Sequence, residues 1–136
     1  MDELLAALDT LAGDDLAPLF GSALLDRLRP LLVAQNRLAA EVARTVRQCE
    51  VSGAAEFDGL KVMTSWLRGH GHLSDAQAAR MVRTGRALEH LPGMAAAFTA
   101  GHVTSEQAGL LARVARVYHR DGEPAQVTAA ADQGLP

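Results

Sequence analysis

The chain has 136 residues and a formal net charge of −3 at pH 7; 49% of its residues are apolar and 4% are aromatic. This length fits one domain, and a single cysteine excludes an internal disulfide. No stretch approaches the ~18 consecutive apolar residues of a membrane span, and the acidic N-terminus is unlike a secretory signal. We therefore expect a soluble, cytoplasmic protein with no membrane partner.

The apolar residues are mostly alanine and leucine, with 26 and 20 copies, and isoleucine is absent. Alanine and leucine are strong helix formers, whereas strands favour β-branched and aromatic side chains. The composition therefore predicts an all-α fold. The charge is uneven along the chain, because residues 1–26 hold six acidic and no basic side chains, whereas residues 27–92 hold ten basic and six acidic ones.

Two helices are predicted in the first part of the chain. Leucines on one face indicate a short helix over Asp2–Leu11, and a much longer periodic run extends from about Leu24 to Val51. Its apolar spacing alternates between three and four residues, as in an amphipathic helix with a coiled-coil seam. Pro30 either bends this helix or starts it. The seam is expected to supply core anchors at Leu31, Leu38 and Val42.

Shorter helices are predicted further along the chain. After a loop at 54–58, they lie around Trp66 and over Ser74–His90, Gly93–Ala100 and Thr104–His119. We expect three parts in all: an acidic helical lead at 1–21, a helical core at 22–120, and a turn followed by an incomplete helix at 121–136.

An internal repeat relates two of these helices. His72–Ala78 aligns without gaps with His102–Ala108, thirty residues later. Each copy begins with a capping-box pattern, in which a hydroxyl side chain and a glutamine three residues later satisfy free backbone N–H groups. Trp66 and Phe98 precede the two copies, and we expect both to be core anchors. The expected caps are Ser74 with Gln77 and Thr104 with Gln107. The pattern predicts two duplicated helix–turn–helix units packed against the long helix.

Arginines recur on one side of the helix that follows each predicted turn. Arg80, Arg83 and Arg86 lie three residues apart, and Arg113 and Arg116 follow in the second copy. In a helix–turn–helix reader the second helix enters the major groove, where basic side chains contact phosphates or guanine. These five residues are candidates for DNA contact. The alternative, a solvated or internally paired arginine face, is favoured slightly by the residues alone.

Other chemistry finds little support in the sequence. His70, His72, His102 and Cys49 are the only candidate metal ligands, and they lack the second closely spaced pair typical of a zinc site. Cys49 lies on the apolar seam, where a buried thiol is the simpler interpretation. No glycine-rich phosphate loop is present. We therefore expect no metal, no cofactor, no small-molecule ligand and no catalysis by this chain.

An ordered series of residues resembles the core of the domain of unknown function 222, over about residues 24–120. The series comprises Gly59, Trp66-Leu67, Leu73-Ser74, Arg83, Arg86 to Leu88, Leu91-Pro92, Ala97-Phe98 and Gly101 to Thr104. Val62 departs from the family, which commonly has a serine or threonine there to cap the tryptophan helix.

The resemblance implies the N-terminal, non-catalytic part of actinobacterial HNH endonuclease-type proteins. An HNH site needs a histidine base and a metal ligand on a ββα framework, and no residue here matches such positions. The chain ends soon after the second repeat, where family members continue into the nuclease module.

We therefore predict a non-catalytic accessory domain that binds or targets DNA. Two alternatives stay open: a helical interaction module that forms a homodimer through the long helix, and a truncated remnant without activity.

Overall fold

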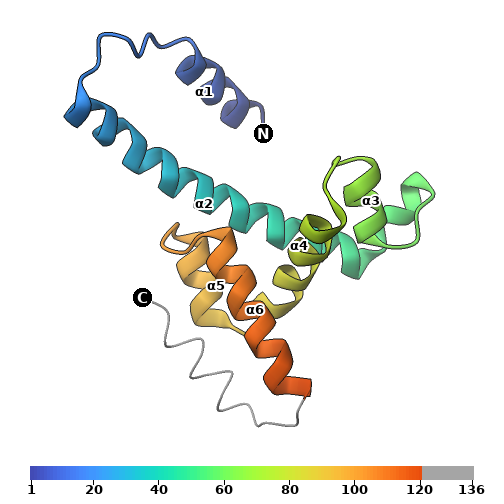
Figure 1. Cartoon of the computed structure of the whole chain (residues 1–136). Helices are drawn as coiled ribbons and strands as arrows, with labels where there is room; N and C mark the ends of the chain where they lie inside the picture. Colours follow the sequence, from blue (N-terminus) through green and yellow to red (C-terminus); the bar gives the residue numbers. More distant parts are fainter. Residues whose placement is uncertain (121–136) are drawn as a thin grey trace. The chain divides into compact units, whose positions relative to one another are not determined.

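The computed structural model describes residues 1–120, with side chains described as far as residue 116 (Figure 1). Its described part contains only helices: α1 (Asp2–Ala12), α2 (Gly21–Ser52), the 3-10 helix η1 (Ala54–Asp58), α3 (Met63–Gly69), α4 (Asp75–Leu88), α5 (Pro92–Thr99) and α6 (Ser105–Arg120). The prediction of an all-α fold is confirmed. The turn and incomplete helix expected at 121–136 lie outside the described residues.

The structure divides into two compact units, Met1–Leu31 and the chain from Leu32 onward. In the first unit, Arg27 on α2 donates to the carboxylate of Asp14 at 2.7 Å and to the carbonyl of Leu11 at 3.1 Å. Helix α2 begins at Gly21 and includes Pro30, so Pro30 does not start it. Leu31, an expected core anchor, is half-buried.

The second half of α2 buries small residues rather than its large ones. Leu38 is 44% exposed and Val42 is 39% exposed, so the prediction that they anchor the core is wrong. Ala40 and Ala43 are buried instead. The reason is the close approach of α2 to α4, since a methyl group added at Gly85 would lie 2.9 Å from the carbonyl oxygen of Ala43. Only small side chains fit such a contact, which leaves the leucine seam outside it.

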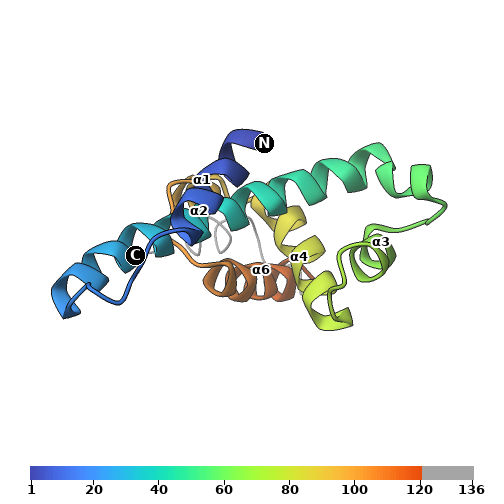
Figure 2. The same cartoon turned by 90° about the horizontal axis from the view of Figure 1, so that it is seen from above.

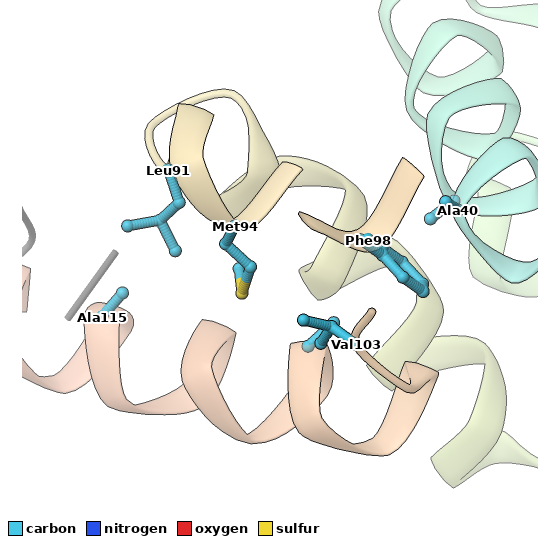
Figure 3. Close-up of a cluster of buried hydrophobic side chains, with 8 residues drawn as sticks. Ala40, Leu91, Met94, Phe98, Val103 and Ala115 are labelled. Atoms are coloured by element: carbon cyan, nitrogen blue, oxygen red, sulfur yellow. The ribbon is translucent and has the colours of Figure 1, made fainter. Parts of the chain in front are cut away.

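Helices α5 and α6 pack with α2 around Phe98, which is 1% exposed (Figure 3). Its ring lies on the side of Ala40, whereas Leu91 lies close to Ala115. Met94 fills the space between them and is fully buried. This cluster fixes α6 relative to the second half of α2.

A second apolar cluster joins α2, η1, α3 and α4, and it contains Val46, Ala55, Met63, Leu67, Ala78 and Val82. Trp66, the other expected anchor, is half-buried at its edge. Its indole N–H donates to Asp58 at 2.7 Å, and its ring stacks on His70 at 5.2 Å between centroids. Trp66 therefore combines apolar packing with a polar contact at the surface.

Both repeat helices begin with the bonds of a capping box. Gln77 N–H donates to the hydroxyl of Ser74 at 3.2 Å, and Ser74 N–H donates back to the Gln77 side chain at 3.2 Å. Thr104 and Gln107 exchange the equivalent bonds at 3.0 and 3.1 Å. Helix α3 begins after Val62, which offers no side-chain cap. The start of each repeat helix is therefore set by local hydrogen bonds.

The two turns before these helices differ by one residue. Positive φ falls at His72 in the first turn, at 56°, and at Gly101 in the second, at 85°. The alignment pairs His72 with His102, not with Gly101. The two copies thus share their caps but not their turn conformation, and a duplicated helix–turn–helix unit remains an interpretation.

Candidate anion-binding site

Four arginines come together on α4 and α6, which pack against each other (Figure 2). Burial lowers the pKa of Arg83, and the positive charges of Arg113, Arg116 and Arg80 lower it further. Like charges disfavour the charged form of a group only when they are close to it. We call Arg80, Arg83, Arg113 and Arg116 the arginine cluster.

A glycine on α6 makes room for this arrangement. A methyl group added at Gly109 would lie 3.1 Å from Cδ of Arg80. The stem of Arg80 therefore crosses α6 where that helix has no side chain. The repeat aligns Gly109 with Ala79, and this replacement of alanine by glycine was the sequence signal for a close approach.

The four arginines of the cluster have no carboxylate partner within the described residues, and among the other arginines with described side chains only Arg37 also lacks one. Arg27, Arg29, Arg44, Arg47, Arg68 and Arg86 each form an ion pair with Asp or Glu. Within the described residues no member of the cluster does so, and the buried Nε of Arg83 has no hydrogen-bond partner there. A buried donor without an acceptor is costly, and an anion bound beside the cluster would offset the repulsion between its positive charges.

Arg86, the fifth candidate for DNA contact, is bound within the protein. It donates to Glu50 on α2 at 2.6 and 2.8 Å. Arg47 joins the same carboxylate and also donates to Glu89 at 2.6 and 3.1 Å. Hydrogen bonding to Arg86, with help from Arg47, holds the pKa of Glu50 below its usual range, and hydrogen bonding to Arg47 does the same for Glu89. This network ties α2 to α4, and residue spacing did not reveal it.

We expect this network to make stability depend on pH under acidic conditions. A carboxyl group whose pKa is lower in the folded state stabilises the fold above its unfolded pKa of about 4.3, and loses that contribution as the pH falls through the folded value. The free energy of unfolding of Glu50→Gln should therefore lie below that of the parent at pH 7. This difference in the free energy of unfolding between the parent and the variant should narrow as the pH falls from about 5 to 3.

Urea denaturation at a series of pH values measures this gap. Glu41→Gln is the matched control, because Glu41 pairs with Arg44 on one exposed face of α2, where such pairs contribute little. A gap for Glu50→Gln that stays constant down to pH 3 would contradict the role given to the network.

A groove of about 500 Å³ adjoins the arginine cluster. Arg83 and Arg116 line it together with Arg86, and Thr64 and His90 also reach it. Its apolar lining consists of small side chains, namely Ala79, Val82, Ala87, Ala112 and Ala115. The groove thus combines positive charge with a shallow apolar surface.

A second groove, of about 720 Å³, runs beside the second half of α2. It is lined by the exposed seam residues Leu32, Leu38 and Val42, and by Arg80 and Met81 from α4. Leu38 and Val42, which were expected in the core, thus form part of a surface. Self-association through this seam stays a prediction.

The metal candidates of the sequence do not come together in the described structure. His70 stacks on Trp66, and Cys49 packs beside the second apolar cluster. Over residues 1–116, whose side chains are described, no group of three or more His, Cys, Asp and Glu side chains is placed to hold a metal ion. In the same residues, no helix has both the length and the apolar character needed to cross a bilayer.

Comparison with known protein families identifies the family of this chain. Residues 25–134 match the model of a domain of unknown function, DUF222. The chain belongs to the DUF222 family. The match begins where the resemblance was expected, and it includes both α4 and α6 of the arginine cluster. No significant match was found among curated proteins or among solved structures. A role for this DUF222 domain therefore has to be argued from its own site.

Proposed function

We propose that this DUF222 domain binds DNA through the arginine cluster and has no catalytic role of its own. One observation carries the proposal: Arg83 is partly buried among three other arginines, and its Nε lacks a partner in the described chain. A folded domain that holds like charges together without carboxylates is suited to an anionic ligand. In this proposal the domain positions DNA for an HNH endonuclease-type protein, an association that rests on the family resemblance alone.

The chemistry of the cluster supports a phosphate ligand. Guanidinium groups donate two parallel hydrogen bonds to phosphate oxygens, and these charge-assisted bonds are among the stronger ones in proteins. Contacts to phosphates account for most protein–DNA hydrogen bonds and fix the register of the protein on the nucleic acid. Because the chain as a whole carries a net charge of −3, attraction to DNA would come from this local cluster rather than from the overall charge.

Binding of the full chain to a labelled 20-base-pair duplex, followed by fluorescence anisotropy between 50 and 200 mM NaCl, tests the proposal. We expect Arg83→Ala and Arg116→Ala each to weaken binding roughly tenfold at 50 mM NaCl, the loss of one charge-assisted contact. Each should also reduce the slope of log K against log salt by about 1. Arg116 is exposed, so its replacement leaves the core intact.

Arg44→Ala is the matched control, because it removes the same charge from α2, where Arg44 is paired with Glu41. It should leave the affinity within about twofold of the parent, a change near 0.4 kcal/mol. Equal losses in Arg44→Ala and Arg83→Ala would show that only net charge matters and would contradict the site. Absence of binding by the parent chain at 50 mM NaCl would contradict DNA binding itself.

A further inference from the structure

The groove beside the arginine cluster is lined from two helices by arginines that have no carboxylate partner in the described residues. Arg83 and Arg116 line it from α4 and α6, and Arg80 and Arg113 lie close enough to affect the charge of Arg83. A surface that tracks a continuous backbone would spread its arginines along the strand, because each internal phosphate carries a single charge. Two guanidinium groups that line one groove, with two further arginines near Arg83, are better balanced by a ligand that carries about two charges there.

Phosphate monoesters and phosphodiesters differ in the charge that one phosphate group carries. A monoester carries about −1.5 to −2 charges at pH 7 and offers three acceptor oxygens. An internal diester carries −1 and has only two oxygens free of ester bonds. A monoester thus has more charge to offset the repulsion within the cluster, and one more acceptor for the arginines that line the groove, Arg83 and Arg116.

The size and lining of the groove also favour a terminal group. Its volume of about 500 Å³ is sufficient for one nucleotide, and its apolar lining is built from alanines and one valine. A phosphate inside a strand is bonded to a nucleotide on each side, whereas a phosphate at the end of a strand is bonded to one nucleotide only. Small apolar side chains beside the charges suit the sugar and base that accompany such a phosphate.

We infer that this groove selects a phosphate monoester, as carried by the phosphorylated end of a DNA strand or by a free mononucleotide. Its strand-end form rests on the proposed DNA-binding function and names the part of the DNA that the site holds. In that form, Arg83 and Arg116 contact the terminal phosphate, and the alanines of α4 and α6 contact the last nucleotide. Arg86 also lines the groove but stays paired with Glu50.

The test compares ligands that differ only in the terminal phosphate. The parent chain is titrated at 100 mM NaCl with a labelled 12-nucleotide strand bearing either a 5′-phosphate or a 5′-hydroxyl group, and separately with dAMP. We expect the 5′-phosphate strand to bind about tenfold more tightly than the 5′-hydroxyl strand. Arg83→Ala and Arg116→Ala should reduce this preference to less than twofold, whereas the matched control Arg44→Ala should retain it.

Each outcome decides a different point. Equal affinity of the two strands would overturn the monoester inference, while a loss of that affinity in the arginine variants would still support DNA binding. Binding of dAMP that depends on Arg83, without binding of either strand, would keep the monoester site and overturn the proposed function. A preference for the 5′-phosphate that survives both arginine replacements would place the site elsewhere and overturn the inference. Absence of binding by all three ligands would overturn both proposals.

Discussion

Replacement of Phe98 by alanine should lower the free energy of unfolding by about 3–5 kcal/mol. The ring is 1% exposed and packs with residues from α2, α5 and α6. Its removal loses the transfer free energy of an aromatic side chain, and it leaves a cavity where three helices meet. Urea denaturation followed by circular dichroism measures the change. We expect the midpoint to shift strongly, because such a loss is a large fraction of the stability of a small domain.

Phe57 provides the matched control for this change, since it is the same residue type and is 93% exposed. Phe57→Ala should change the free energy of unfolding by less than about 0.5 kcal/mol. A loss for Phe98→Ala as small as that for Phe57→Ala would contradict the core around α5. It would also remove the basis for placing α6 against the second half of α2.

The helices could be predicted from the sequence because their determinants are local. Ser74 and Gln77, like Thr104 and Gln107, lie within one turn of each other, and their bonds form in the way that the capping-box pattern predicts. The high content of alanine and leucine favours helix at every position in the chain. Fold class and most element boundaries therefore required no knowledge of tertiary contacts.

The packing of α2 could not be predicted in the same way. Periodicity indicates that a helix has an apolar face, but it does not say which neighbour covers that face. Here the alanine face meets α4, because Gly85 allows the two backbones to approach. Leu38 and Val42 of the predicted seam line a surface groove instead. Small residues are a weak signal in a periodicity analysis, although they permit the closest contacts.

The candidate site was predictable in part for a similar reason. The spacing of Arg80, Arg83 and Arg86 places all three on one side of α4, and this follows from helix geometry alone. Arg86 differs from the other two because it pairs with Glu50, which lies 36 residues away in the sequence. Arg80 and Arg83 have no such partner in the described chain. Carboxylate pairing therefore separates Arg86 from these two arginines, and only the folded structure reveals it.

Replacement of Gly101 by alanine should lower the free energy of unfolding by about 2–4 kcal/mol, through two additive causes. Its φ of 85° lies in the left-handed region, which costs a residue with a side chain about 1–2 kcal/mol. In addition, a methyl group there would lie 2.7 Å from Cγ1 and 2.9 Å from the carbonyl oxygen of Val33 on α2. Relief of this overlap must move the turn away from α2, where Asn36 donates to the Gly101 carbonyl at 3.1 Å.

Gly59 separates the two causes, because its φ is 77° and nothing lies within 4 Å of a methyl group added there. Gly59→Ala should therefore lose only the conformational part, about 1 kcal/mol. The difference between the two variants, measured by urea denaturation under identical conditions, reports the contact between the second turn and α2. Equal losses for the two variants would mean that the turn does not rest on α2. In that case Gly101 would serve the turn conformation alone, and Val103 and Phe98 would have to hold α5 and α6 against α2 without it.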